Sequence, residues 1–332
     1  MFIAHLINDS FADPGVYVKF KYRNEAILFD LGDIHRLSSK EILRIKYVFI
    51  SHTHMDHFIG FDHLLRVCLG RNRHISLFGP PGFIRNVENK IGAYTWNLVE
   101  NYTNDFAFTV VEVQKERKIT SRYHCRNAFS PEAVDSVEAF NGTLVDTPVF
   151  SVKGVFLDHK IPSLAFSLEE KIHVNIMKNA LIDMNLSTGK WLAEFKNSVV
   201  GNYPDDTPIK VTGKKESTGT VERTIPLGVL KEKIVKVTKG QKISYVADAV
   251  YSEDNSKKIV ELARSSDTMF IEAPFLDKDA DTASEKYHLT AKQAGILARK
   301  AEVKNITVFH FSPKYKGYGN LLTEEAMRAF RG

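Results

Sequence analysis

Short runs of apolar and β-branched residues dominate the first half of the chain. Residues 16–22 (VYVKFKY) alternate and lead through a turn into residues 26–33 (AILFDLGD), which predicts a β-hairpin. Residues 46–50 (KYVFI) are almost continuously apolar, as is typical of a strand covered on both faces of its sheet. Residues 57–69 have the apolar spacing of a helix that ends at Gly70. Further strands are expected over 75–83, which a helix should follow, 106–113 and 149–159.

The same alternation of strand and helix returns in the second half. Strands are predicted over 242–250, 268–274 and 305–313, and helices over 256–266 and 290–303. Strands followed by helices, twice over, predict an α/β fold in which sheets pack together with helices outside.

The segment 171–242 interrupts this pattern. It is rich in Pro, Gly, Thr and charged residues, and it predicts a protruding hairpin or loop without a core. The segment contains twelve Lys and one Arg but only seven Asp and Glu. This surplus of positive charge accounts for the net charge of +5 of the whole chain. A polyanionic partner and a solvated lysine-rich surface both explain this balance. We expect one domain over 1–170 and 243–332, with 171–242 as an inserted basic arm or loop region.

The composition is that of an ordinary globular protein, with 43% apolar and 26% charged residues in 332. No apolar run is long enough to span a bilayer, and the N-terminal residues lack the basic region of a secretory signal. The two cysteines, Cys68 and Cys125, favour a reducing, cytoplasmic location and are too few for a thiolate zinc site. Any metal should therefore be held by His and carboxylates.

Such ligands crowd together in residues 50–57, ISHTHMDH. A lone His is most often structural or exposed, but this spacing is different. His52 and His54 point the same way on an extended chain, and Asp56 and His57 follow at the start of the next helix. Burying these polar groups unpaired would be costly, and His nitrogens with carboxylate oxygens suit zinc or similar ions. The spacing predicts metal binding.

Four ligands within six residues cannot easily share one tetrahedral ion, but they can serve two neighbouring ions. Three further candidates stand at the ends of predicted strands, where functional sites collect: His159, Asp248 and His310. The remaining histidines considered lack such a position and are expected to be surface or structural residues: His5, His35, His74, His124 and His173.

This ligand order resembles the metallo-β-lactamase fold superfamily over nearly the whole chain, and within it ribonuclease Z. The ribonuclease Z resemblance is carried by residues 51–65 (SHTHMDHFIGFDHLL), 77–83 (LFGPPGF), 286–315 (KYHLTAKQAGILARKAEVKNITVFHFSPKY) and 176–198, which stand where that family has its tRNA-binding arm. It implies a four-layer αββα sandwich with an inserted arm, and a possible homodimer in which one subunit's arm serves the other's site.

The resemblance also implies roles for single residues. His52, His54 and His159 would hold one ion, Asp56, His57 and His310 the second, and Asp248 would bridge them. Asp30 would orient ligands from beneath, although a turn residue is the simpler interpretation of Asp30 alone. His288 would lie beside the metals as a proton donor or charge stabiliser. Thr290 would cap the helix that follows.

The resemblance implies that the protein is a two-metal phosphodiesterase. A metal-bound hydroxide, oriented by Asp56, would cut tRNA precursors at their 3′ side, with RNA gripped by the basic 171–242 arm. The ions would be two divalent cations, Zn²⁺ first, with Mn²⁺ or Fe as other occupants of this ligand set.

Departures from the family pattern keep a second interpretation open. The chain lacks the family's Gly- and Ser-rich opening loop, has YVADAV around Asp248, and has HLT after Tyr287 where some members place a Glu. The alternative is a hydrolase of the same fold that acts on a small molecule, such as a cyclic nucleotide, lactone or thioester. A di-iron oxidoreductase is disfavoured because position 54 is His, and a non-catalytic RNA-binding protein because the ligand set is complete.

Overall fold

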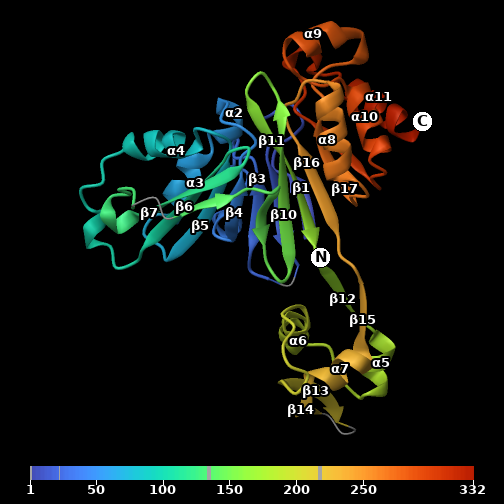
Figure 1. Cartoon of the computed structure of the whole chain (residues 1–332). Coiled ribbons are helices and arrows are strands. Elements are labelled where there is room, and N and C mark those ends of the chain that lie inside the picture. Colours follow the sequence, from blue (N-terminus) through green and yellow to red (C-terminus); the bar gives the residue numbers. More distant parts are fainter. Residues whose placement is uncertain (1, 22, 133–135, 216–218) are drawn as a thin grey trace. The chain divides into compact units, whose positions relative to one another are not determined.

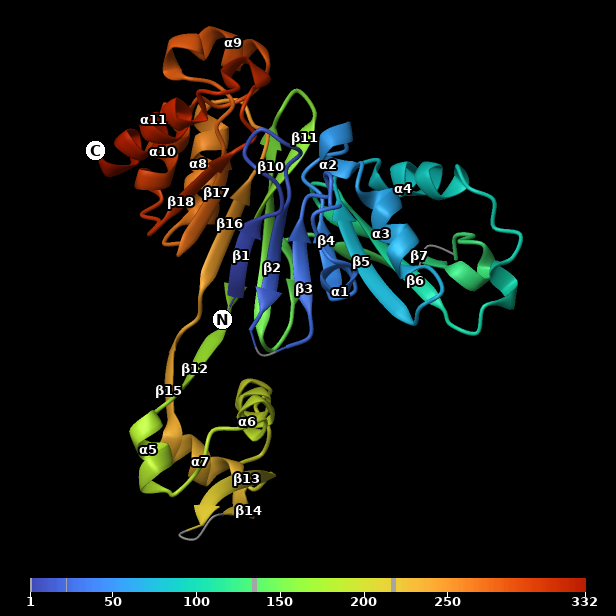
Figure 2. The same cartoon turned by 180° about the vertical axis from the view of Figure 1, so that it is seen from behind.

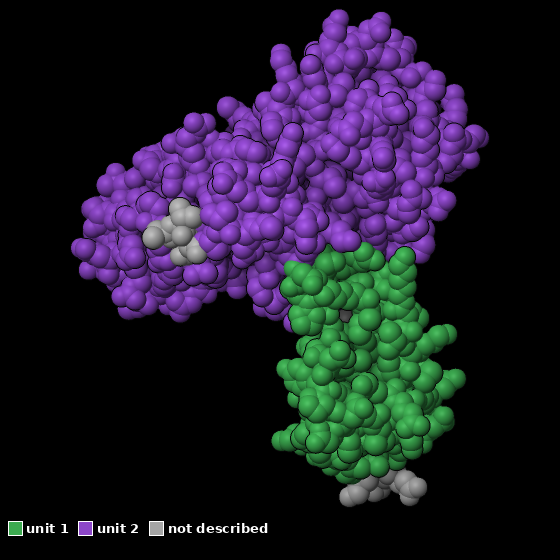
Figure 3. Space-filling view, in the orientation of Figure 1, with its two compact units in different colours: residues 1, 146–151, 169–241 green, residues 2–145, 152–168, 242–332 purple. Residues whose placement is uncertain are grey.

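A computed structural model describes all residues except 1, 22, 133–135 and 216–218. The described chain forms two compact units, which Figure 3 distinguishes by colour. The larger unit comprises residues 2–145, 152–168 and 242–332, and the smaller unit comprises residues 146–151 and 169–241.

One sheet of the larger unit has eight described strands, which are hydrogen-bonded in chain order. Its β2 and β3 pair antiparallel, so the predicted hairpin is confirmed. The ladders from β3 to β6 are parallel. The strands are β1 (Phe2–Leu6), β2 (Val16–Phe20), β3 (Ala26–Phe29), β4 (Ile45–Phe49), β5 (Arg73–Gly79), β6 (Phe106–Val113), β7 (Arg117–His124) and β8 (Ser136–Ala139).

The second sheet has six described strands in the order β18-β17-β16-β11-β10-β9. Its β16, β17 and β18 run parallel, so their carboxyl ends meet at one edge. The strands are β9 (Thr143–Asp146), β10 (Phe150–Asp158), β11 (Pro162–Glu170), β16 (Lys242–Val246), β17 (Thr268–Glu272) and β18 (Ile306–Phe309).

Aromatic side chains join the two sheets face to face. Phe29 of β3 stacks on Phe166 of β11 and on Tyr245 of β16, with ring centroids 5.6 Å apart in both pairs. Helices cover the outer faces, with α3 and α4 on the first sheet and α8, α10 and α11 on the second (Figures 1 and 2). The predicted αββα layering is confirmed. These helices are α3 (Phe61–Cys68), α4 (Phe83–Gly92), α8 (Glu253–Ala263), α10 (Ala291–Lys300) and α11 (Gly319–Arg331).

Short helical turns connect these layers. They are α1 (Ser39–Ile42), α2 (Met55–Phe58), α9 (Ala280–Glu285) and the 3₁₀ turns Val99–Asn101, Cys125–Asn127, Asp277–Asp279 and Pro313–Tyr315.

The single helix predicted over 57–69 is wrong, because the structure divides it into α2 and α3. At the break, the Gly60 N–H donates to the Leu31 carbonyl over 2.9 Å. A Cβ on Gly60 would lie 2.1 Å from the Gly32 carbonyl oxygen. The chain therefore bends here to dock on the loop after β3, which a periodicity argument cannot detect.

The smaller unit has its own core, unlike the loop that its composition predicts. Apolar side chains of its helices are buried together, among them Trp191, Phe195, Leu227 and Leu230. Many of the charged residues are exposed around this core, whereas Pro208 and Pro226 lie in strands and Gly228 lies in a helix. The elements are β12 (Ile172–Ile176), α5 (Lys178–Asp183), α6 (Trp191–Val200), β13 (Pro208–Lys215), β14 (Gly219–Pro226), α7 (Leu227–Ile234) and β15 (Val235–Lys239), and residues 216–218 lie outside the described residues.

Two expectations from composition concern the chain as a whole. In the part of the chain that the structure describes, no helix has both the length and the apolar character needed to cross a bilayer. Cys68 and Cys125 are both buried and free.

Candidate metal centre

The site lies entirely in the larger unit, on loops that follow strands of both sheets. The first sheet supplies the loop after β4, with His52 and His54. The second sheet supplies His159 after β10, Asp248 after β16 and His310 after β18. Parallel strands bring their carboxyl ends to one edge, so residues more than 200 positions apart in the sequence meet there.

The loop after β4 is held from both sheets. The Ser51 N–H donates to Asp30 Oδ1 over 2.6 Å, and the Ser51 carbonyl accepts from the Leu164 N–H of β11 over 2.9 Å. His52 follows Ser51 directly, and His54 follows two residues later. The two rings point the same way, with His52 Nε2 2.9 Å from His54 Nδ1. The extended loop therefore presents both imidazoles to one point.

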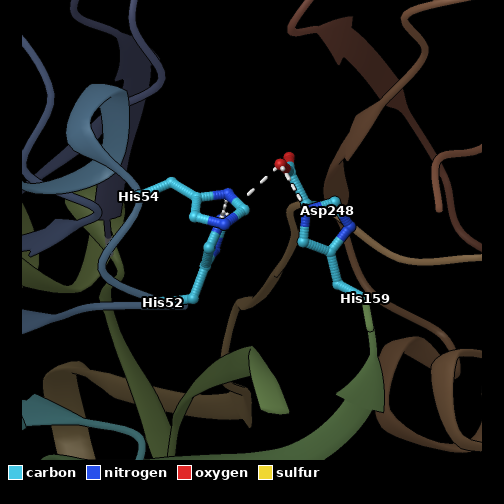
Figure 4. Close-up of side chains that lie close together, drawn as sticks. All are labelled: His52, His54, His159 and Asp248. Carbon is cyan, nitrogen blue, oxygen red and sulfur yellow. Dashed lines mark hydrogen bonds and ion pairs between the residues drawn. The ribbon is translucent and has the colours of Figure 1, made fainter. Parts of the chain in front are cut away.

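The Asp248 carboxylate lies at the centre of the cluster. Its Oδ2 is 3.7 Å from Nε2 of His52, 3.5 Å from Nε2 of His57 and 3.4 Å from Nε2 of His159. Figure 4 shows His52, His54 and His159 converging on this carboxylate. Two ligand atoms that are each about 2.1 Å from a tetrahedral ion lie about 3.4 Å apart, so the spacing suits shared coordination.

The structure brings all seven predicted ligands together. In each of three groups the candidate ligand atoms lie within 4.8 Å of one another. One group is His52, His54, His159 and Asp248, and another is Asp56, His57 and His310. The third group links these two, because it contains Asp248 and His310 together with Glu272 and His288.

Three buried atoms in this cluster have no hydrogen-bond partner among the described residues: His57 Nε2, Asp248 Oδ1 and His310 Nδ1. The last two lie 2.9 Å apart but are not aligned as donor and acceptor. An unsatisfied buried polar atom costs about 1–3 kcal/mol, and a cation between them removes that cost. The residues therefore fit divalent metal ions.

The electrostatics of the cluster support the same conclusion. Burial lowers the pKa of His57, but the Asp248 and Asp30 carboxylates oppose it and raise that pKa to about 10. Burial and the neighbouring His57 lower the pKa of His52 to about 2. Although burial favours its neutral form, His310 and His57 hold the pKa of Asp248 well below its usual value. The carboxylates thus favour a positive charge in the cluster. A metal ion supplies that charge when it displaces the proton of His57.

Asp30 holds the His57 ring from below. Its Oδ2 accepts from the Tyr245 hydroxyl and lies 2.7 Å from His57 Nδ1, while the Ser51 hydroxyl donates over 2.8 Å. The His57 Nε2 is thereby directed toward Asp248. Asp30 is fully buried and has a positive φ of 55°. Asp30 therefore fixes the orientation of the His57 ring.

Glu272, at the end of β17, is a residue of the centre that the sequence analysis missed. Its fully buried carboxylate lies 2.7 Å from His288 Nδ1 and accepts from the N–H groups of Ala249 and Leu289. The sequence contains a signal for it, because Glu272 lies near the C-terminal end of the strand predicted over 268–274, as Asp248 and His310 do in theirs.

His288 lies between α9 and α10, with its ring centroid 5.6 Å from that of His310 and 4.9 Å from that of His159. Burial lowers the pKa of His288, but the Glu272 carboxylate overcomes this effect and the pKa is raised. Thr290 caps α10 through a capping box with Gln293, as expected from the sequence. His159 is fixed by a 2.7 Å contact between its Nδ1 and the Tyr287 carbonyl.

Comparisons with known proteins agree with this geometry. No family model matches the chain. It is 27% identical over 293 residues to the ribonuclease Z of Deinococcus radiodurans, covering 87% of this chain and 83% of that protein. It is 25% identical over 302 residues to the ribonuclease Z of Nanoarchaeum equitans, covering 89% and 77%.

Solved structures show the same fold. The metallo-β-lactamase fold protein YhfI of Bacillus subtilis superposes with a TM-score of 0.55 at 14% identity, covering 99% of this chain and 93% of that one. Human tRNase Z, short form, superposes with a TM-score of 0.53 at 18% identity, covering 94% and 93%. The chain therefore has the metallo-β-lactamase fold, and it is similar over most of its length to proteins named ribonuclease Z.

Proposed function

We propose that the chain is a metal-dependent endoribonuclease of the ribonuclease Z type, which cleaves tRNA precursors at their 3′ side. The convergence of seven His and Asp side chains, with Asp248 at their centre, carries the proposal, because three of their buried atoms lack any described partner. The similarity to ribonuclease Z proteins over 87% of the chain supports RNA as the substrate.

We propose that the ligands divide as the first two groups do. His52, His54 and His159 would hold one ion, Asp56, His57 and His310 the other, and Asp248 would bridge them. Two bound ions supply activated water and positive charge at the reacting phosphate. Zn²⁺ is the proposed metal because imidazole and carboxylate ligands suit it, and Mn²⁺ and Fe are the competing occupants.

The chain's own acid and base groups would move the protons. Asp56 Oδ2 lies 3.1 Å from His310 Nε2 and 3.6 Å from His57 Nε2, and despite burial these imidazoles lower the pKa of Asp56. Asp56 would therefore remain an ionised acceptor beside the attacking water. His288, whose Nδ1 is held by Glu272, would donate a proton from Nε2 to the departing 3′-oxygen.

The basic arm would give affinity without sequence selection. Lysine side chains of the smaller unit would neutralise RNA phosphates, so binding should weaken as salt rises. A homodimer in which one subunit's arm serves its partner's metal centre, and a cytoplasmic location, remain parts of the same proposal.

A cleavage assay tests the proposal directly. Wild-type protein should cut a tRNA precursor at its 3′ side, and His288→Ala should lower the rate about 10²–10⁴-fold while metal content stays constant. Arg328→Ala, on the exposed side of α11, is the matched control and should cut like wild type.

The second candidate is a hydrolase of a small phosphodiester or ester. It is favoured by the sequence departures around Asp248 and His288, and by the fold, which is shared by proteins of other activity. Hydrolysis of a chromogenic phosphodiester by protein that leaves tRNA precursors intact would replace the first proposal with this one.

A further inference from the structure

A groove of about 560 Å³ lies in the larger unit. This volume is within the range of about 300–1,000 Å³ that is typical of small-ligand sites. Its walls come from the loop after β3, from α3, and from the connection between α4 and β6. The residues used below are His35, Ile59, His63, Arg66, Tyr94 and Trp96.

Two wall segments of the groove adjoin metal-ligand residues in the chain. Ile59 follows His57 by two residues and is 43% exposed. The loop that carries His35 begins at Asp30, and its Gly32 packs so closely that a Cβ there would lie 2.5 Å from the Asp56 carbonyl oxygen. The groove therefore shares wall segments with the loops that carry Asp56 and His57.

Two aromatic side chains, Tyr94 and Trp96, contribute to the lining. Tyr94 is 47% exposed, and its ring lies 6.0 Å from that of Trp96. Trp96 is fixed from behind by Phe129, with centroids 4.9 Å apart, and by a hydrogen bond from its Nε1 to the Ile91 carbonyl. Exposed and immobilised aromatic faces of this kind are surfaces on which nucleobases stack.

A second pair of rings lines the same groove. His35 and His63 lie with ring centroids 4.1 Å apart and an interplanar angle of 33°. Asp33 Oδ1 lies 2.6 Å from His35 Nδ1 and fixes that ring. The imidazoles therefore add hydrogen-bonding edges to a wall that is otherwise aromatic and aliphatic.

The charges of the groove leave one cation available. Asp62 is paired with Lys90 at 2.7 Å, and Asp33 is paired with His35. Arg66 of α3 is exposed, and no ion pair is recorded for it among the described residues. Its guanidinium can bind a phosphate through two parallel hydrogen bonds.

We propose that this groove binds one nucleotide of the RNA next to the cut bond, with its base against Tyr94 and Trp96 and its phosphate at Arg66. This inference rests on the proposed function. The groove combines two aromatic side chains, an exposed Arg without an ion pair among the described residues, and walls next to metal-ligand residues in the chain, which together match a nucleotide better than an apolar peptide. It would position the RNA strand near the metals, independently of the basic arm.

Kinetics on a tRNA precursor test the inference. Tyr94→Ala and Arg66→Ala should each raise KM, the former about 5- to 100-fold, as expected for the loss of one base stack. Tyr94→Phe keeps the ring and should restore a KM close to wild type. Arg328→Ala removes an equally exposed Arg from α11 and should leave KM unchanged. Metal content equal to wild type verifies that each variant is folded.

Abasic substrates locate the contact. Substrates that lack the base on the 5′ or on the 3′ side of the cut should be compared. For one of the two sides, removal of the base should raise the KM of wild type. On that side it should raise the KM of Tyr94→Ala only slightly. Such non-additivity is expected when base and ring form one interaction. Equal penalties in wild type and Tyr94→Ala on both sides would overturn the inference.

Fluorescence gives a readout that does not need cleavage. The chain has two tryptophans, Trp96 and Trp191, so Trp191→Phe leaves Trp96 as the reporter. A single-stranded RNA with the sequence around the cut should quench Trp96, and Arg66→Ala should weaken the quenching. Absence of quenching would contradict a base in the groove.

The outcomes separate the two proposals. If wild type cleaves precursors while Tyr94→Ala and Arg66→Ala keep its KM, the nucleotide site is rejected and the proposed function stands. If wild type cleaves no precursor, the proposed function fails and the nucleotide site fails with it. Self-association that Tyr94→Ala abolishes, with KM for RNA unaltered, would make the groove an interface between copies of the chain and also reject the inference.

Discussion

The Asp30 side chain shows how single residues prepare the metal centre. Its two oxygens bind the backbone and hydroxyl of Ser51, the Tyr245 hydroxyl and the His57 ring. One carboxylate from the first sheet thus aligns a ligand loop and is itself fixed by a tyrosine of the second. Hydrogen bonds thus hold the Ser51 loop and the His57 ring in position.

Replacing Asp30 tests this preparation. Asp30→Asn keeps the shape but weakens the charge-assisted contact to His57, so metal affinity should fall about 10- to 100-fold. Metal content measured after dialysis against graded chelator reports the change. Asp254→Asn removes an exposed carboxylate on α8 and is the control. Unaltered metal affinity in Asp30→Asn would show that Asp30 has no orienting role.

Glu272 should act through His288 as a positioning residue. Glu272→Gln removes the charge that raises the pKa of His288, so RNA cleavage should slow by about 10²-fold. A nitrophenyl phosphodiester should be affected much less, because nitrophenolate departs without a proton. Rates on both substrates give the comparison, and an equal loss on both would assign Glu272 to holding the metals instead.

At the scale of elements, the junction of α2 and α3 joins the ligand loop to the rest of the first sheet. The Leu31 N–H donates to the His57 carbonyl, and the Gly60 N–H donates to the Leu31 carbonyl, both over 2.9 Å. The Asp30 loop and the short α2 helix are therefore one packed unit. Close backbone contact at Gly60 is what allows them to meet.

Gly60→Ala should break this contact. The new Cβ would lie 2.1 Å from the Gly32 carbonyl oxygen, so unfolding free energy should fall by about 1–3 kcal/mol, and metal affinity should fall with it. Gly92→Ala is the matched control, because no heavy atom lies within 4 Å of its Cβ position, and it should gain up to about 1 kcal/mol. Denaturant titration measures both, and equal stability of the two variants would refute the argument.

At the scale of the whole molecule, separate cores support the two units. Leu64, Phe83 and Phe108 belong to a core of the larger unit, and Phe195 and Leu230 belong to that of the smaller unit. The chain enters and leaves the smaller unit through β12 and β15, which pair antiparallel. The segment between two paired residues of β12 and β15 can therefore be deleted and the ends joined.

Deleting residues 173–238 and joining Ile172 to Lys239 with glycines tests the arm, since these two residues are partners across the ladder. Affinity for a tRNA precursor should fall, and log Kd should depend less steeply on log salt because fewer phosphates are neutralised. Hydrolysis of a small phosphodiester reports on the metal centre, all of whose residues lie outside the deletion. An unchanged salt dependence would contradict RNA binding by the arm.

Much of the fold follows from local sequence. The hairpin of residues 16–29, the strand 106–113 and the capped helix at Thr290 are where alternation, periodicity and capping predict them. These features depend on neighbouring residues. The break at Gly60 and the core of the smaller unit depend on contacts between distant segments, and periodicity contains no information about those.

For the site, the sequence by itself predicted a set of candidate metal ligands. His52 and His54 are two apart on an extended loop, Asp56 and His57 follow them, and His159, Asp248 and His310 stand at the ends of predicted strands. Only the tertiary structure decided that Asp248 lies at the centre, that Glu272 holds His288, and that His35 and His63 face each other in a groove. The reason is physical: spacing along a strand is set by local backbone geometry, whereas contacts between loops are set by how the two sheets pack.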